Sequence, residues 1–214
     1  MEIAPRRALI LVDVQNEYFN GPLKIRRPDP TRSLPQILRV VDGANDADIP
    51  VVCVRHTAVP GAPVFDPARP GHRLHECVEA RRLSSWKDLE KRHASIYAGT
   101  GLAEWLRELA IDTVTLVGYQ SNNCILASAV EGEALGFATE VLSDATGAIH
   151  ISNDVGSIDA RTLHEALMTL LHSNWATVMD SDSWLQAVSE GGRLPHSNLV
   201  VSALRGAELF DDAP

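Results

Sequence analysis

The sequence has few cysteines, little positive charge and no long hydrophobic run, and each of these absences argues against a class of protein. Its three cysteines are widely spaced and form no Cys-x-x-Cys pair, so we expect reduced thiols in a cytoplasmic protein. With 19 Lys and Arg against 28 Asp and Glu, the formal net charge is −9, and such a surface repels nucleic acid and anionic lipid. No run is apolar for long enough to predict a membrane span or a signal-peptide core.

What the sequence does contain is an alternation of short β-branched runs with amphipathic segments. Nearly continuous apolar character predicts buried parallel strands at residues 8–12, 50–54, 113–118, 138–144 and 175–180, with a weaker sixth candidate around Leu89. Helical periodicity lies between them, as in "GTGLAEWLRELAI", where Thr100 is a predicted N-cap. The alternation predicts an α/β fold, with helices on both sides of a mostly parallel sheet in a three-layer α/β/α arrangement.

Two segments do not fit this alternation. Residues 57–73 are rich in proline and glycine and are expected to form a long surface loop, of the kind that often covers a binding site. The length of 214 residues predicts one domain over 1–214, with residues 189–214 as a C-terminal tail. The tail has an apolar patch, which either packs on the edge of its own domain or on a neighbouring subunit.

Three chemically reactive side chains stand at the carboxyl ends of predicted strands, where open parallel sheets bind their ligands. Asp13 ends the first strand, Lys91 ends the weak candidate, and Cys124 lies in the turn before a small-residue helix. A helix N-terminus and a nearby lysine both favour a thiolate, and a carboxylate can move the thiol proton to a leaving amine. The trio therefore indicates acyl transfer, although a capping Asp and a buried packing Cys would also fit the spacing alone.

Three motifs carry a family resemblance. "ALILVDVQNEYF", "KRHASIYAGTGL" and "LVGYQSNNCILASAVEGEALGFATEVLSDAT", in this order, resemble the isochorismatase-like cysteine hydrolase superfamily over about residues 6–185. That family includes nicotinamidases, N-carbamoylsarcosine amidase, ureidoacrylate amidohydrolases and isochorismatases. The resemblance implies a six-stranded parallel sheet, Asp13, Lys91 and Cys124 as catalytic residues, and a homodimer or homotetramer.

The resemblance also implies details of the pocket. It places a cis peptide between Tyr119 and Gln120, which would direct the backbone amides of Gln120 and Cys124 at an oxyanion. Aromatic and polar side chains near the motifs predict a wall suited to a small planar or cyclic substrate, formed by Tyr18, Phe19, Tyr97, Tyr119 and Asn123.

Departures from the family pattern narrow the expected substrate. Nicotinamidases carry an Asp-x-His metal pair after the second strand, whereas this chain has His56 and Ala58 there, so we expect no metal and no nicotinamide substrate. Isochorismatases cleave a vinyl ether without a cysteine nucleophile, so Cys124 favours C–N bond hydrolysis. The sequence thus predicts a cofactor-independent cysteine hydrolase that acts on a small amide, ureide or N-carbamoyl compound through a thioester.

Other interpretations stay open or are disfavoured. The chain could be a non-catalytic α/β binding or assembly module, or an ether hydrolase of the isochorismatase type. A redox role is disfavoured because no resolving cysteine lies near Cys124. His72 and His75 lack the further ligands of a metal set, and His164 is expected to pack or cap within its helix.

Overall fold

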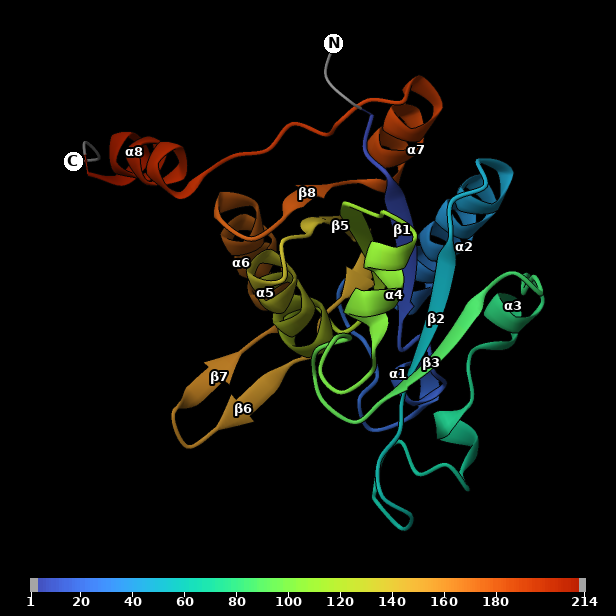
Figure 1. Ribbon diagram of the computed structural model, residues 1–214. Helices are drawn as coiled ribbons and strands as arrows, with labels where there is room; N and C mark the ends of the chain where they lie inside the picture. The colour runs from blue at the N-terminus through green and yellow to red at the C-terminus, as the bar shows by residue number, and fades with distance from the viewer. Residues whose placement is uncertain (1–3, 212–214) are drawn as a thin grey trace.

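A six-stranded sheet organises the computed structural model, which describes residues 4–211. Its order is β3-β2-β1-β4-β5-β8, and every neighbouring pair is parallel (Figure 1). The strands are β1 Arg7–Val12, β2 Val51–His56, β3 Lys87–Lys91, β4 Thr113–Tyr119, β5 Ala138–Gly147 and β8 Thr177–Met179. All six predicted strands are therefore present, the weak candidate around Leu89 included.

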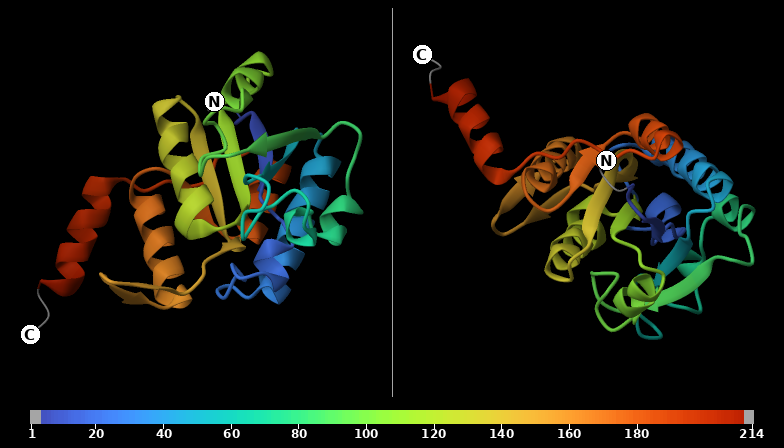
Figure 2. Two further views of the ribbon diagram at one scale, coloured as in Figure 1. Left: turned by 90° about the horizontal axis from the view of Figure 1, so that it is seen from below. Right: turned by 45° about the horizontal axis from the view of Figure 1, so that its top comes forward.

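Helices cover both faces of the sheet and bury a hydrophobic core on each side (Figures 1 and 2). One face packs against α4 Leu102–Glu108, α5 Leu126–Ala134 and α6 Ala160–Ser173. The other packs against α1 Glu17–Asn20, α2 Pro30–Asp46, α3 Glu76–Glu79 and α7 Ser181–Glu190. The predicted three-layer α/β/α class is thus confirmed.

Helix ends follow capping chemistry, with one difference from prediction. The Asp29 side chain accepts from the Thr31 amide at the start of α2, and Asp159 does the same for α6. Thr100 is not the N-cap of α4, because Gly101 takes that position with a φ of 69°. The Thr100 hydroxyl still accepts from the Leu102 amide at 3.3 Å, so the predicted residue satisfies a helix donor from one position earlier.

A hairpin and a C-terminal helix are among the elements that the sequence did not predict. A short polar hairpin, β6 Ile151–Asn153 and β7 Gly156–Ile158, projects from the body before α6. Helix α8 Leu199–Phe210 forms from the apolar patch of the tail, while residues 212–214 of that tail lie outside the described residues. Within residues 4–211, the helices are all too short or too polar to cross a bilayer.

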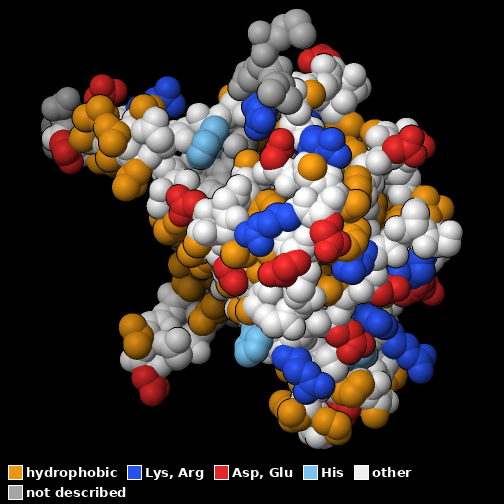
Figure 3. Space-filling view, in the orientation of Figure 1, with side chains coloured by type: hydrophobic (Ala, Val, Ile, Leu, Met, Phe, Trp, Pro, Cys, Tyr) orange, Lys and Arg blue, Asp and Glu red, His pale blue; other side chains and the backbone are white. Residues whose placement is uncertain are grey.

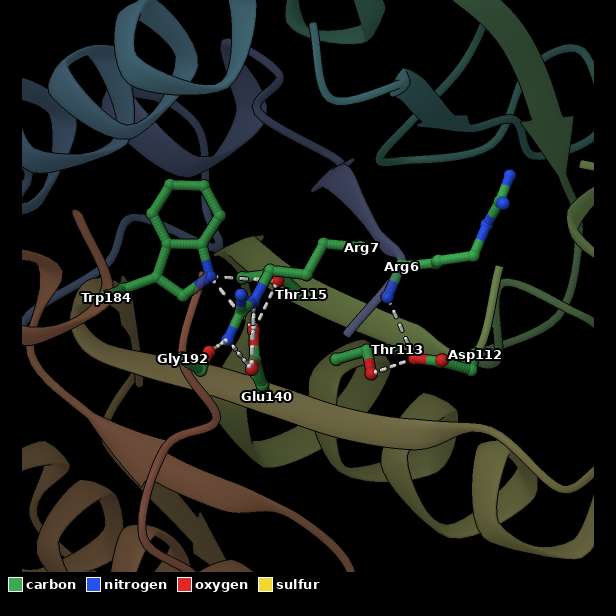
Figure 4. Close-up of polar contacts among 8 residues, drawn as sticks. All are labelled: Arg6, Arg7, Asp112, Thr113, Thr115, Glu140, Trp184 and Gly192. Carbon is green, nitrogen blue, oxygen red and sulfur yellow. Dashed lines mark hydrogen bonds and ion pairs between the residues drawn. The ribbon is translucent and has the colours of Figure 1, made fainter. Parts of the chain in front are cut away.

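A buried ion pair joins β1 to β5 near the amino ends of the strands. Arg7 forms a bidentate pair with Glu140, with Nη2 at 2.9 Å from Oε1, and both side chains are almost fully buried (Figure 4). Glu140 Oε2 also accepts from Thr115 Oγ1 at 2.7 Å and from Trp184 Nε1 at 2.9 Å. Since Trp184 lies on α7, this network ties the last helix of the body to the sheet.

Replacing Arg7 by methionine should lower the free energy of unfolding by about 3–5 kcal/mol, because the substitution leaves the Glu140 carboxylate buried without its counter-ion. The measurement is urea denaturation followed by circular dichroism. The matched control is Arg39→Met, which removes an exposed pair with Asp182 and should lose less than about 1 kcal/mol. Equal losses in the two variants would contradict this account of the network.

Candidate active site

Three polar side chains that follow separate strands meet in a fully buried cluster, called the trio below. Lys91 Nζ lies 2.7 Å from Asp13 Oδ2 and 3.2 Å from Cys124 Sγ. The exposed fractions of Asp13, Lys91 and Cys124 are 0%, 1% and 2%. The structure therefore brings together the three residues that the sequence predicted as catalytic.

The topology of the sheet explains where the trio lies. The strand order reverses between β1 and β4, and the crevice at such a switch point is where open α/β sheets bind ligands. Asp13 directly follows β1, and Cys124 lies in the turn after β4. Lys91 ends β3, which is separated from β1 by β2, a distance of about 10 Å at the usual strand spacing. Only a long side chain can reach across that gap.

The backbone brings the ends of β1 and β4 close to each other. A Cβ on Gly118 would lie 2.1 Å from the Val12 carbonyl oxygen, and Gly118 has a φ of 102°, so only glycine fits here. Asp13 itself has a φ of 50°, an uncommon conformation for a residue with a side chain. Its amide donates to the Val54 carbonyl at 3.0 Å, which keeps this bend attached to β2.

Lys91 is held by more than its charge partner. Its Nζ also lies 3.1 Å from His56 Nδ1 and donates to the His93 carbonyl at 3.2 Å. Burial lowers the pKa of Lys91, because it disfavours the positive charge. The hydrogen bonds and the negative charges of ionised Asp13 and Cys124 outweigh burial, so the pKa of Lys91 is raised. The ammonium form is therefore stable in this buried position.

His56 acts as a neutral acceptor for that ammonium group. Burial, together with the positive charge of Lys91, lowers the pKa of His56 to about 4, so its Nδ1 carries a lone pair at neutral pH. Gln15 fixes the backbone of the same residue, since its side-chain amide accepts from the His56 N–H at 2.8 Å and donates to the His56 carbonyl at 3.0 Å. His56 is thereby placed at the end of β2 with its ring against Lys91.

The protonation state of Cys124 differs from the sequence-based expectation. Burial raises the pKa of its thiol to about 12, the Asp13 carboxylate adds to this effect, and Lys91 opposes it. Lys91 thus favours the thiolate, as expected, but desolvation outweighs it, so the thiol keeps its proton in the substrate-free protein. Burial also raises the pKa of Asp13, which makes this carboxylate a better proton acceptor. Asp13 Oδ1 accepts no hydrogen bond from residues 4–211, so it is open to the thiol proton.

Two aromatic rings pack around the trio. Phe65, from the loop of residues 57–73, has its ring centroid 4.9 Å from His56 and 5.5 Å from Tyr18. Burial raises the pKa of Tyr18 well above its usual value. The negative charges that Cys124 and Asp13 carry when ionised add to this effect, because the phenol lies near the trio. Both rings are buried.

The loop of residues 57–73 is attached firmly at its base. The Thr57 amide donates to the Lys91 carbonyl at 2.9 Å, and the Ala58 amide donates to the Phe65 carbonyl at 3.0 Å. A cavity of about 870 Å³ lies beside this region, between Glu17, Arg55 and residues 70–76, but the trio does not line it. The loop thus begins directly beside the backbone of Lys91, and its Phe65 reaches back to His56.

The predicted pocket wall is only partly assembled near the trio. Tyr18 is adjacent to it, whereas Phe19 and Tyr119 pack behind Tyr18, each 5.6 Å from a neighbouring ring, and the Tyr119 hydroxyl bonds Ser33 Oγ at 2.8 Å. Asn123 is exposed on the turn after β4. The structure does not bring Tyr97 to the trio, since its ring stacks on Phe137 at 5.8 Å in the core under α4 and α5.

The turn that carries Cys124 is fixed by side chains from two other segments. The Tyr119–Gln120 bond is cis, as the resemblance implied, and residues Ser121–Ile125 form one π-helical turn before α5. Ser121 Oγ bonds His164 Nδ1 at 3.1 Å, and the other ring nitrogen of His164 bonds the Ser143 carbonyl at 3.0 Å. His164 therefore has a packing role, as expected, but what it supports is the turn of the nucleophile.

His72 and His75, which the sequence also singled out, each make a local hydrogen bond. His72 Nε2 bonds Thr57 Oγ1 at 2.8 Å, and His75 Nδ1 accepts from the Cys77 amide at the start of α3. In the described part of the chain, His, Cys, Asp and Glu side chains form no group of three or more arranged to hold a metal ion.

Sequence reasoning missed the roles of His56 and Phe65. His56 was noticed only as a replaced metal ligand, although its place at the end of a predicted strand was sufficient to put it at the same edge as Asp13 and Lys91. Phe65 had no comparable signal. It lies in a segment without strand or helix periodicity and has a φ of 56°, so its inward position depends on tertiary contacts.

The comparisons with known proteins agree with this geometry. The isochorismatase domain model matches residues 7–183. The chain belongs to the isochorismatase family. The resemblance to isochorismatase-like cysteine hydrolases is thus confirmed.

Relatives of this isochorismatase-family hydrolase include both solved structures and curated proteins. A crystal structure of a Burkholderia xenovorans protein assigned as an isochorismatase is 38% identical, with a TM-score of 0.93 over 96% of this chain and 99% of the other. Maleamate amidohydrolase of Pseudomonas putida is 29% identical over 67% of this chain and 73% of its own. A secreted isochorismatase effector of Verticillium dahliae is 28% identical over 81% of this chain and 87% of its own.

The substitution Asp13→Asn should speed alkylation of Cys124. The Asp13 carboxylate raises the pKa of the thiol, so its removal lowers that pKa and increases the thiolate fraction at pH 7–8. For each unit by which the pKa falls, the rate should rise about threefold, because the tenfold gain in thiolate is partly offset by lower nucleophilicity. The measurement is the iodoacetamide rate at Cys124, followed by peptide mass spectrometry.

Lys91→Met is the matched comparison for that experiment. Lys91 lowers the pKa of Cys124, so its removal should slow alkylation at the same pH. Cys53 is buried and its pKa is also raised to about 12, so its rate should stay unchanged in both variants. Slower alkylation of Cys124 in Asp13→Asn would contradict the assigned electrostatics.

Replacing His56 by alanine should reduce kcat about tenfold to a hundredfold in any hydrolysis that depends on Lys91. The loss corresponds to one hydrogen bond to a charged group, about 1.5–3 kcal/mol. His56→Gln, which keeps an acceptor atom, should recover part of the rate. Because the pKa of His56 is about 4, the pH–rate profile between pH 6 and 9 should keep its shape in His56→Ala. Loss of a titration in that range would assign His56 a proton-transfer role instead.

Proposed function

We propose that this isochorismatase-family protein is a metal-independent amidohydrolase that cleaves a C–N bond of a small amide, ureide or N-carbamoyl compound. The observation that carries the proposal is the contact of one lysine with both a carboxylate and a thiol, at 2.7 Å and 3.2 Å, in a site closed to water. This set contains a nucleophile, a base with raised pKa and a cation that can stabilise the thiolate as it forms.

In the first half of the reaction, Cys124 Sγ attacks the substrate carbonyl carbon while its proton passes to Asp13 Oδ1. The ammonium group of Lys91 stabilises the negative charge on sulfur before the C–S bond is complete. The backbone amides of Gln120 and Cys124, in the turn after β4, are the proposed donors to the carbonyl oxygen as it becomes an oxyanion. The tetrahedral species then breaks its C–N bond, and Asp13 returns the proton to the leaving amine or ammonia.

In the second half, water hydrolyses the thioester. Asp13, again ionised, accepts a proton from water as the hydroxide attacks the acyl carbon, and the departing thiolate takes that proton back. The products are a carboxylic or carbamic acid and the protonated thiol, so the trio returns to its starting state. The cycle needs no further reactant besides water.

The enclosure of the site supports a small substrate. Asp13, Lys91 and Cys124 are buried, and Phe65 packs on His56 and Tyr18 beside them, so we propose that a substrate reaches Cys124 when the loop of residues 57–73 moves. This supports the role of that loop as a lid, with Phe65 as the side chain that enters and leaves the pocket. A planar amide fits between two such rings better than a bulky one.

The relatives favour amide chemistry without fixing the substrate. Maleamate amidohydrolase is named for a C–N bond, whereas the Verticillium relative is named for isochorismatase activity. Vinyl ether hydrolysis is the second candidate reaction, but it would leave the contact of Cys124 with Lys91 without a use. The contact therefore favours the covalent route.

A screen of primary amides, ureides and N-carbamoyl compounds should find a substrate that releases ammonia or an amine, and Cys124→Ser should reduce kcat at least about a thousandfold. Cys77→Ser is the matched control, because Cys77 is a half-buried thiol distant from the trio and its removal should leave the rate unchanged. Trapping of an acyl group on Cys124 by mass spectrometry would identify the intermediate. Turnover by Cys124→Ser equal to wild type would refute the covalent mechanism.

A further inference from the structure

Helix α8 stands apart from the rest of the protein (Figures 1 and 2). None of its twelve residues is buried, and its main contact with the body is a small one with the end of α6. Large apolar side chains cover its surface, with exposed fractions of 58% for Leu199, 67% for Val200, 61% for Leu204, 68% for Leu209 and 74% for Phe210.

Such a helix is not stable as an isolated structure in water. Only Arg205 and Glu208 are charged, so the helix is apolar over most of its circumference, a composition typical of a buried helix. Helices of about twelve residues are marginal without tertiary packing. The N-terminus of the helix is nevertheless capped, since the Asn198 side chain accepts from the Val201 amide at 2.9 Å. Its missing stabilisation must come from a surface that this chain does not supply.

Residues 193–198 and α8 together form an arm. The base of this arm is fixed, so α8 is held away from the core of its own chain. Gly191 ends α7 in the left-handed conformation, and Arg7 Nη2 donates to the Gly192 carbonyl at 2.8 Å (Figure 4). Residues 193–198 then run without helix or strand to α8. The buried Arg7–Glu140 network thus anchors the start of a six-residue connector that carries an apolar helix outward.

A partly apolar face lies on α5 and α6, where polar side chains such as Glu131 and Thr169 lie among the apolar ones. On α5, Ala127, Val130 and Ala134 follow helical spacing, and Val130 is 39% exposed. On α6, Ala166 and Leu170 are on the solvent side, with Leu170 44% exposed. In Figure 3, hydrophobic side chains line the recess between the projecting α8 and the β6–β7 hairpin. The small alanines allow another helix to approach closely.

We propose that α8 docks on the α5–α6 face of a second copy of this chain, and that the α8 of the second copy docks on the same face of the first, in a two-fold symmetric exchange. A closed exchange satisfies both helices with one type of contact, as expected for a symmetric dimer. With Val201, which is 37% exposed, the large apolar side chains of α8 number six and expose on the order of 700 Å² per arm, so two arms and the faces they cover exceed the roughly 1,600 Å² of a standard stable interface.

The crystal structure from Burkholderia xenovorans supports this role. Its match leaves about 4% of this chain uncovered, which is less than α8 and the residues after it comprise, so the match extends into α8. The arm is therefore a shared feature of two proteins that are 38% identical, and not a peculiarity of this sequence.

The test is sedimentation equilibrium of the full-length protein and of two variants from about 0.1 to 50 μM. We expect the wild type to be a dimer, or a larger assembly that contains it. Leu204→Asp on the arm and Leu170→Asp on the receiving face should each weaken association at least about a hundredfold, because each change occurs twice in a symmetric dimer. An equimolar mixture of the two variants should form more dimer than either variant alone, since one intact arm then meets one intact face.

Leu83→Asp is the matched control. Leu83 is 47% exposed, in the segment between α3 and β3, and this variant should associate like the wild type. Circular dichroism of all variants checks that the fold is retained. A monomeric wild type over the whole range overturns the proposal, as does a dimer that neither Leu204→Asp nor Leu170→Asp weakens. Binding of a monomeric wild type to phosphatidylcholine or phosphatidylserine vesicles would assign α8 to a lipid surface instead.

Discussion

The contact of Lys91 with both Asp13 and Cys124 is the interaction on which the candidate site depends. It connects residues at the ends of three strands that are far apart in the sequence. Asp13 and Lys91 are 78 positions apart, and Lys91 and Cys124 are 33 positions apart. Three neighbouring residues support this contact. The absence of a side chain at Gly118 allows β1 and β4 to approach, Gln15 holds the end of β2, and His56 occupies the remaining side of the ammonium group.

A buried charge cluster of this kind needs protection from water as well as internal partners. Desolvation raises the pKa values of Asp13 and Cys124, so the resting site holds a proton that the sulfur gives up only during attack. Tyr18 and Phe65 pack on each other beside these residues. Because Phe65 belongs to the loop of residues 57–73, the proposed opening of this loop would also change the desolvation of the thiol.

The sequence was sufficient for the sheet and for the trio, and the physical reasons are specific. Parallel strands buried on both faces leave runs such as residues 8–12 that are readable without knowledge of their neighbours, and the residues after them share one edge. The state of Cys124 was not predictable in the same way, since the balance between helix end, lysine and burial depends on how completely water is excluded. The positions of Phe65, Tyr97 and α8 were not predicted, for a related reason. Their positions depend on contacts with distant segments or with another molecule, and local periodicity records neither.

The two buried ion pairs of the sheet show how structure and chemistry are separated within one fold. At the amino ends of the strands, the Glu140 carboxylate receives donors from Arg7, Thr115 and Trp184, so its hydrogen bonds hold the fold together. At the carboxyl edge, Asp13 has Lys91 as its ion-pair partner and leaves Oδ1 without a hydrogen bond among the described residues. This carboxylate therefore keeps an oxygen that can take the thiol proton in the proposed reaction. The first network, through Arg7 and Gly192, also fixes the base of the arm that carries α8, so the ion pair at the amino ends of the strands adjoins the segment that we infer organises assembly, while the pair at the carboxyl edge belongs to the proposed reaction.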